Sequence, residues 1–393
     1  MSPNRFEWAG LVVQLAGVVG FGYLTWRMLD HSTGAATRRE VEKQRKELVT
    51  KLRKLGRRVD DDFSCDEYEA KFFDALVYPS QIKVDFSCLA GSPEFLLSVR
   101  DTVVEPLQHL SESMATPEGV LFYGPPGTGK TMLARCIAKE CNATFLNVSY
   151  AQLKSKFVGD SEKNVSAMFT LARKLAPTVI FIDEIDALLK SRSVDMQFAA
   201  SSSSMKATFL SSWDGLLEHN DPSKPVIVIG ATNRAQDIDE AFLRRFSRRF
   251  AFHLPETEDR CDVVRMELLR LMKKDMRLRF EIEGRSITCD ELAQIKHATW
   301  LSELGKITEG YSHSDLCKMV QAATQLLLRK HRYSHAEVPP LTWDHLMRGY
   351  RMVKPPVTIF DDVRQQQQDV LRKARRGQQI RAQLAAVDAS GID

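Results

Sequence analysis

Residues 124–131 have the types and the order needed to hold a chain of phosphates. They follow an apolar stretch, residues 119–123, and precede a helical pattern at 132–140, so we expect a strand, a loop and a helix in that order. Glycines allow the loop backbone to approach the phosphates, Lys130 supplies positive charge, and the hydroxyl of Thr131 suits Mg²⁺. The predicted nucleotide contacts in this segment are Gly124, Pro125, Pro126, Gly127, Thr128, Gly129, Lys130, Thr131 and Met132.

Two adjacent carboxylates follow a second apolar stretch. The run at 179–182 predicts a buried strand, and Asp183 and Glu184 come directly after it. Because α/β sheets bind ligands at the carboxyl ends of their strands, both side chains are expected near the phosphates. Asp183 suits the Mg²⁺ shell, and Glu184 suits the polarisation of an attacking water. For the nearby Asp186, simple capping of the following helix remains an open alternative.

A third apolar stretch, residues 226–229, leads towards Asn233. A short amide at the end of a neighbouring strand can bridge the attacking water and the terminal phosphate. Asn233 is therefore predicted to sense that phosphate, and the ends of three strands would converge on one phosphate group. Together these segments predict a site that binds ATP with Mg²⁺ and hydrolyses it.

The elements that position this site belong to a chain of 393 residues, long enough for about two compact domains and extensions. The net charge of +4 is too small to indicate nucleic acid as the main partner. Positive charge is concentrated at residues 38–58, which contain ten Lys or Arg and three Glu. The seven cysteines are scattered and never spaced as Cys-x-x-Cys, which argues against a disulfide framework or a zinc cluster.

An uncharged, mostly apolar stretch near the N-terminus, residues 8–26, predicts a membrane span. As a helix it would reach about 28 Å, close to the thickness of the hydrocarbon core. Trp8, Tyr23 and Trp26 lie near its two ends, and the basic cluster after it favours a cytosolic location for the rest of the chain. A cleaved secretory signal usually has a shorter apolar region preceded by basic residues. Residues 41–59 show helical apolar spacing, which fits either a short coiled-coil linker or a basic face on anionic lipid.

These motifs resemble the AAA ATPase family across residues 84–352. The resemblance implies an α/β fold, with a doubly wound αβα nucleotide-binding domain and a small helical lid, and it implies assembly into a ring, usually a homo-hexamer. It also assigns Ala90 and Gly91 to the adenine and Ser314 to the nucleotide from the lid. The matching motifs are 124–131, Phe-Ile-Asp-Glu-Ile-Asp at 181–186, Gly-Ala-Thr-Asn-Arg at 230–234, and the segment 310–316.

The apolar and charged segments, together with the resemblance, give a division of the chain. We expect a short non-cytosolic N-terminus, a transmembrane helix, a charged amphipathic linker, the large ATPase subdomain, the helical lid, and a C-terminal helix and tail. Their expected ranges are 1–7, 8–29, 30–83, 84–254, 255–352 and 353–393.

Two arginines, Arg244 and Arg245, occupy the place where related sequences carry an arginine that reaches the terminal phosphate of a neighbouring subunit. Such a residue stabilises the transition state, so both are predicted to be catalytic. The alternative for each is a solvated basic turn, and Arg248 and Arg249 are weaker candidates.

A segment between the phosphate loop and the acidic strand, residues 156–163, matches the pore loop of AAA unfoldases. Phe157 is predicted to grip extended polypeptide there, with Lys156 and Val158 beside it, because an aromatic ring makes a large apolar contact that demands no particular hydrogen bonds. The whole arrangement resembles the Thorase-type proteins, translocases that remove mislocalised tail-anchored proteins from the outer mitochondrial membrane. Two positions depart from that pattern: Val158 stands where a second aromatic is usual, and Cys88 where an Asp is usual.

The resemblance implies an extractor of tail-anchored proteins, anchored once in the outer mitochondrial membrane with its motor in the cytosol; the peroxisomal membrane is a further possible location. A severing or disassembly ATPase is the alternative, but those relatives carry a helical domain of about 80 residues before the motor, and the linker is too short for one. A membrane protease would need His-Glu-x-x-His, which is absent from the sequence. A scaffold without turnover would need no Glu184.

Overall fold

The computed structural model describes residues 41–43, 45–47, 49–50, 63–108, 119–155, 159–189, 199–218, 225–275, 278–282, 284–295, 298–330, 338–353 and 355. They fall into two compact units. The first takes the described residues of Met1–Phe86, Glu94–Gly124 and Lys130–Ala251, and the second those of Ser87–Pro93, Pro125–Gly129 and Phe252–Asp393. The predicted membrane span at 8–29 lies outside the described residues, as does nearly all of the tail at 353–393. Within the described ranges, no helix combines the length and the apolar character that crossing a membrane requires.

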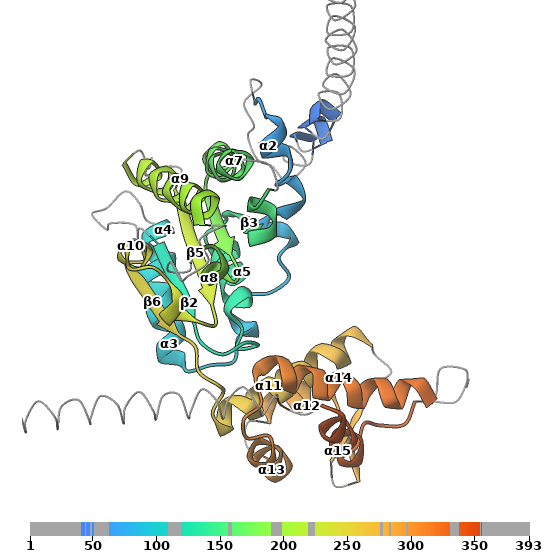
Figure 1. Cartoon of the computed structure of the whole chain (residues 1–393). Coiled ribbons are helices and arrows are strands. Elements are labelled where there is room, and N and C mark those ends of the chain that lie inside the picture. The colour runs from blue at the N-terminus through green and yellow to red at the C-terminus, as the bar shows by residue number, and fades with distance from the viewer. Residues whose placement is uncertain are drawn as a thin grey trace, which may run out of the picture. The chain divides into compact units, whose positions relative to one another are not determined.

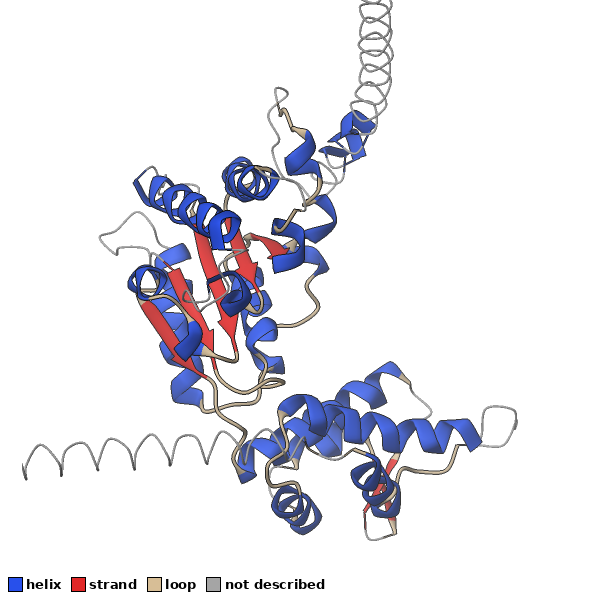
Figure 2. Ribbon diagram, viewed as in Figure 1, coloured by secondary structure: helices blue, strands red, loops and turns tan. Residues whose placement is uncertain are grey.

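A six-stranded sheet forms the centre of the first unit (Figure 2). Its strand order is β1-β3-β4-β5-β2-β6; β1 pairs antiparallel with β3, and the other pairs are parallel. Parallel strands are buried on both faces, which explains why β4 and β5 consist of uninterrupted buried residues. The predicted doubly wound α/β fold is therefore confirmed. The strands are β1 (Leu76–Val77), β2 (Gly119–Tyr123), β3 (Thr144–Val148), β4 (Thr178–Ile182), β5 (Val226–Thr232) and β6 (Arg248–Ala251).

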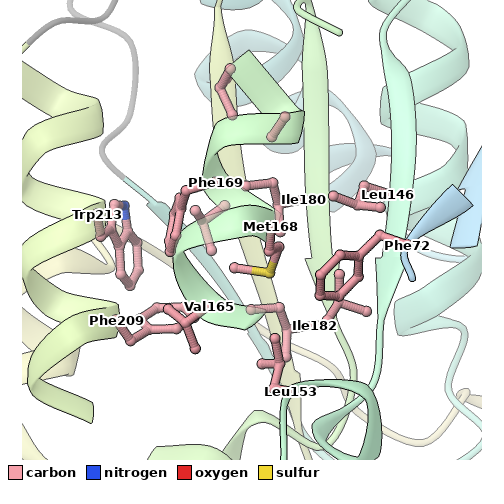
Figure 3. Close-up of a cluster of buried hydrophobic side chains, with 14 of the residues drawn as sticks. Phe72, Leu146, Leu153, Val165, Met168, Phe169, Ile180, Ile182, Phe209 and Trp213 are labelled. Carbon is pink, nitrogen blue, oxygen red and sulfur yellow. The ribbon is translucent and has the colours of Figure 1, made fainter. Parts of the chain in front are cut away.

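Helices cover both faces of this sheet (Figure 1). On one face, Met168 of α7 and Phe209 of α9 belong to the same apolar cluster as Ile180 of β4 (Figure 3). Side chains alternate along a strand, so Phe181 faces the other way and stacks on Phe145 at 5.5 Å between ring centroids. The helices are α3 (Pro93–Val99), η4 (Arg100–Val104), α4 (Glu105–Gln108), α5 (Lys130–Glu140), α6 (Tyr150–Leu153), α7 (Asp160–Lys174), α8 (Ile185–Leu189), α9 (Ala199–Glu218), η5 (Ala235–Asp237) and α10 (Glu240–Arg245).

The end of the predicted linker, residues 63–83, is an integral part of the first unit. Phe72 is fully buried in the same cluster as α7. Glu69, only 1% exposed, receives the ammonium of Lys174 from α7 at 2.7 Å. A buried carboxylate needs such a partner, so this ion pair fixes the linker to the motor. The elements here are α2 (Glu67–Ala70), η1 (Phe73–Ala75), η2 (Pro79–Gln81) and η3 (Phe86–Cys88), of which Ser87 and Cys88 belong to the second unit.

The second unit has its own apolar core, built mainly by α11, α13, α14 and α15. Gly349 allows α15 to lie directly on α14, because an added Cβ there would collide with the backbone carbonyl of Met319. The predicted helical lid is present, but the sequence analysis missed a two-stranded hairpin within it. The elements are α11 (Thr257–Lys274), β7 (Phe280–Ile282), β8 (Arg285–Ile287), α12 (Cys289–Gln294), α13 (Thr299–Ile307), α14 (His313–Lys330) and α15 (Trp343–Met352).

Candidate nucleotide site

Lys130 begins α5 and lies at the carboxyl end of the sheet. Its ammonium donates to the carbonyl oxygen of Gly124 and to Oδ1 of Asn233, both at 2.8 Å. The side chain is largely buried, and burial lowers the pKa of Lys130 to about 8, against the attraction of Asp183. A partly desolvated cation of this kind binds anions strongly, because little water has to be removed from it.

The loop before Lys130 depends on backbone angles that glycine adopts easily. Gly124, Gly127 and Gly129 have φ values of 141°, 75° and 96°. The hydroxyl of Thr128 donates to the carbonyl of Pro125 at 2.8 Å and braces the turn from within. The predicted strand, loop and helix therefore occur in that order, with Met132 half-buried in the first turn of α5 and Pro126 exposed in the loop.

Asp183 follows β4 and lies beside the start of α5. The hydroxyl of Thr131 donates to Oδ2 of Asp183 at 3.3 Å, so a hydroxyl and a carboxylate from two elements are adjacent. Two hard oxygen donors next to a phosphate loop fit Mg²⁺, which usually keeps water and takes its other ligands from the nucleotide. The residues present therefore suit the metal that the sequence predicts.

Glu184 has an unusual backbone. Its φ is +49°, in the left-handed region that non-glycine residues avoid, and its side chain is exposed. Its N–H donates to Oδ1 of Asp183 at 2.9 Å, and its carbonyl accepts from the N–H of Ala187, in the first turn of α8. Strained backbone that the surrounding contacts hold in place is a frequent property of functional sites. Here it turns an acidic side chain towards solvent directly after the sheet.

The end of β5 carries Asn233 to Lys130, and a local network holds it there. The hydroxyl of Thr232 donates to Oδ1 of Asp186 at 2.6 Å and accepts from the N–H of Arg234 at 2.8 Å. The carbonyl of Thr232 also accepts from the N–H of Gly124 at 3.2 Å. Sequence reasoning left Asp186 as a possible helix cap, whereas the structure shows that it fixes the strand end next to Asn233.

The two predicted arginines differ in their surroundings. Arg245 makes a bidentate pair with Asp214 of α9 at 2.6 and 2.7 Å and also donates to the carbonyl of Ala241. Arg244 is 75% exposed and contacts Glu240, one helical turn before it, at 3.0 Å. An exposed i,i+4 pair contributes little energy, so the Arg244 guanidinium can leave it readily.

The second unit contains the residues predicted to meet the base. The N–H of Ser314 donates to the carbonyl of Gly127 at 3.0 Å, and Nε2 of His313 lies 3.2 Å from the carbonyl oxygen of Ala90. Gly91 has open space around it, since no atom lies within 4 Å of an added Cβ. The start of α14 is thus in contact with the phosphate loop, at Gly127, and with the segment predicted to meet adenine, at Ala90. His313 was not singled out from the sequence.

The predicted pore residues Lys156, Phe157 and Val158 lie outside the described residues. On either side of them, the N–H of Ser155 donates to the hydroxyl of Ser161 at 2.9 Å. Both ends of this segment are therefore tied to the start of α7.

The chain is similar to known proteins along most of its length. The family model described as the ATPase family associated with various cellular activities (AAA) matches residues 120–254. An outer mitochondrial transmembrane helix translocase of Danio rerio is 34% identical over 362 residues, which cover 89% of this chain and 91% of that protein. Spastin of Drosophila mojavensis is 41% identical over 244 residues, covering 61% of this chain and 29% of spastin. The solved AAA domain of FIGL-1 in complex with ADP has a TM-score of 0.56 at 33% identity, covering 72% of this chain and 88% of that one.

Proposed function

The chain belongs to the AAA ATPase family and, within it, to the outer mitochondrial transmembrane helix translocases; from that premise we propose that it uses ATP hydrolysis to extract membrane proteins from the mitochondrial outer membrane. Its clients are mislocalised tail-anchored proteins, and it threads them through the pore of a homo-hexamer. The observation that carries this proposal is similarity to a translocase along 89% of the chain, well beyond the ATPase domain itself.

Hydrolysis is assigned to residues at one edge of the sheet. Glu184 accepts a proton from the water that attacks the terminal phosphate, Lys130 holds the phosphate oxygens, and Asn233 bridges the attacking water and the terminal phosphate. The 2.8 Å contact between Lys130 and Asn233 supports this assignment, because it brings the cation and the amide to one point. Mg²⁺, when bound with the nucleotide, would be held by Thr131 and Asp183 and would neutralise phosphate charge.

A ring gives a role to Arg244. A guanidinium supplied to the neighbouring subunit's nucleotide stabilises charge that develops as the phosphate is transferred. The exposure of Arg244 supports this role, whereas Arg245 would first have to release Asp214. We therefore assign the trans-acting function to Arg244 and an internal, positioning function to Arg245.

Substrate gripping is assigned to Phe157, with Lys156 and Val158 beside it. Only Gly159 separates these residues from α7 in the chain. Lys174, the last residue of α7, forms an ion pair with Glu69 of the linker. The proposed membrane helix at 8–29 lies before that linker in the chain. A short connection between anchor and motor would keep the pore close to the membrane surface, where an extractor meets its clients.

A severing or disassembly activity is the second candidate function, and the similarity to spastin supports it. That similarity covers 29% of spastin and leaves the rest of spastin unmatched. The translocase of Danio rerio is matched along 91% of its length, which favours extraction.

The test is ATP-dependent release of a fluorescent tail-anchored protein from liposomes that contain the full-length chain. We expect release with ATP, none with a non-hydrolysable analogue, and none with Glu184→Gln. Phe157→Ala is expected to retain ATPase activity and lose release. ATP hydrolysis at a normal rate without release from the membrane would overturn the extraction proposal and favour disassembly of soluble complexes.

The proposed location needs its own measurement. We expect the full-length chain, tagged at its C-terminus, to fractionate with mitochondria and to lose the tag when intact mitochondria are treated with protease. A tag protected from protease, or a chain that fractionates with peroxisomes alone, would contradict a cytosol-facing motor in the mitochondrial outer membrane.

A further inference from the structure

His313, the first residue of α14, carries a nitrogen that the described residues leave without a partner. Its Nε2 lies 3.2 Å from the carbonyl oxygen of Ala90. A carbonyl oxygen only accepts hydrogen bonds, so Nε2 must carry the proton of this contact. The other nitrogen, Nδ1, is shielded from solvent, and no hydrogen-bond partner for it exists in the described part of the chain.

The protonation state of the ring follows from these surroundings. Burial lowers the pKa of His313, against the opposing effects of the Ala90 carbonyl and the Asp259 carboxylate. The ring is therefore neutral at pH 7, with its proton on Nε2, and Nδ1 presents a lone pair. A buried acceptor without a donor is costly, so this site favours a ligand that brings an N–H group.

The position of His313 connects it to the nucleotide. On either side of it in the chain, Ser312 and Ser314 contact the phosphate loop: an added Cβ at Gly127 would lie 2.5 Å from Oγ of Ser312, and the N–H of Ser314 donates to the carbonyl of Gly127. The ring itself reaches Ala90, which together with Gly91 is the segment proposed for the base. His313 therefore lies in the chain between two residues that contact the phosphate loop, and its ring contacts the segment proposed for the base.

We propose that His313 is a specificity-determining residue that reads the base of the bound nucleotide, its Nδ1 accepting a hydrogen bond from the exocyclic amine of adenine while its Nε2–H holds the Ala90 carbonyl. This inference rests on the proposed assignment of Ala90 and Gly91 to the base. Guanine carries a carbonyl oxygen where adenine carries the amine, so two acceptors would face one another and GTP would be rejected.

The experiment compares nucleotide dissociation constants in the full-length chain carrying Glu184→Gln, so that the nucleotide is not consumed. The probes are ATP, GTP, and purine riboside triphosphate, which has neither an amine nor an oxygen at the relevant carbon. We expect ATP to bind more tightly than the other two nucleotides by roughly tenfold or more. This is the gain in affinity expected when Nδ1, a buried acceptor, receives a hydrogen bond from the adenine amine.

The matched variant is His313→Gln, whose side-chain amide can still donate to the Ala90 carbonyl but offers no acceptor at the place of Nδ1. It is expected to weaken ATP binding by roughly tenfold and to bind ATP and purine riboside triphosphate equally. Equal weakening of ATP and GTP, or tighter ATP binding in the variant, would overturn the proposal. A thermal melt of each variant reports whether the lid is still folded.

A further control separates this inference from the nucleotide assignment and from the proposed function. Lys130→Ala is expected to abolish binding of all three nucleotides. If it binds them normally, the phosphate-loop assignment is wrong. If it abolishes binding while His313→Gln leaves the preference for ATP intact, only the role of His313 is wrong. Neither result depends on membrane extraction, because the readout is binding alone.

Discussion

The ammonium of Lys130 and the side-chain oxygen of Asn233 lie 2.8 Å apart, although 103 positions separate the two residues in the chain. The cation proposed to bind phosphate and the proposed phosphate sensor therefore share a hydrogen bond. A phosphate entering the site competes for the same ammonium, so binding must redistribute the contacts of Lys130. Occupancy of the loop is therefore expected to act on Asn233 through Lys130.

The lowered pKa of Lys130, about 8, predicts that ATP affinity falls as the pH rises. At pH 7 the lysine is mostly protonated, and at pH 9 it is mostly neutral in the protein without nucleotide. Phosphates need the ammonium, so binding at pH 9 requires uptake of a proton and weakens the affinity by about tenfold relative to pH 7. Calorimetric titrations at pH 7, 8 and 9, in two buffers of different ionisation enthalpy, measure both the affinity and the proton uptake.

Constant affinity across this range, with no proton uptake at pH 9, would show that Lys130 keeps its charge throughout. Lys130→Ala serves to confirm that the binding measured is at the phosphate loop, because that variant should give no signal at any of the three pH values.

Asn233→Ala is expected to lower kcat by about 100-fold and to change the KM for ATP little, because the amide is proposed to act on the attacking water and the terminal phosphate. Steady-state hydrolysis assays on the full-length chain separate the two constants. A rise in KM at unchanged kcat would mean that Asn233 contributes to ground-state binding alone. A melting curve is needed beside the assay, since the neighbouring Thr232 and Asp186 hold the same strand end.

Arg244→Ala and Arg245→Ala form a matched pair on adjacent residues. Arg244 is exposed, and among the described residues its side chain contacts Glu240 alone, so its removal should leave the melting temperature unchanged and reduce ATPase activity of the assembled ring by about 1,000-fold. Removal of Arg245 breaks the pair with Asp214, and a loss of about 1 kcal/mol corresponds to a fall of roughly 2–4 °C in melting temperature. Equal effects of both variants on melting temperature would contradict this division of roles.

Two central residues of the candidate site, an acid and an amide, were predictable because each directly follows an apolar strand. Asp183 follows β4 and Asn233 follows β5, and parallel strands end at one edge, so local sequence was enough to bring them together. Contacts between elements distant in sequence were not predictable. No local pattern pairs Arg245 with Asp214 or Thr232 with Asp186, because their distances depend on how α9 and α8 pack against the sheet.

Two features of the second unit were also missed, for a different reason. The strands at 280–282 and 285–287 are only three residues long, too short for an alternating pattern to stand out from the helical segments around them. The environment of His313 depends on a carbonyl 223 positions earlier in the chain, which no spacing rule connects to it.

The contact between linker and motor leads to the last prediction. The hydroxyl of Tyr68, in α2, donates to Oδ1 of Asp160 at 3.0 Å, and it accepts from the ammonium of Lys163 at 3.3 Å. Asp160 is the first residue of α7 and follows the proposed pore segment 156–158 almost directly. We therefore expect this hydroxyl to be one route by which a force on the proposed pore residues reaches the linker.

Tyr68→Phe removes the hydroxyl and keeps the ring. It is expected to leave ATP hydrolysis unchanged, to lower stability by about 1 kcal/mol, and to reduce ATP-dependent release of a tail-anchored protein several-fold. Tyr150→Phe is the matched control, because it removes a phenol hydroxyl for which the described residues provide no hydrogen bond. Parallel ATPase and release assays decide the question. If Tyr68→Phe releases the client as fast as Tyr150→Phe, the hydroxyl does not couple the linker to the pore, and other contacts of the linker with α7, such as the buried pair of Glu69 and Lys174, carry the load.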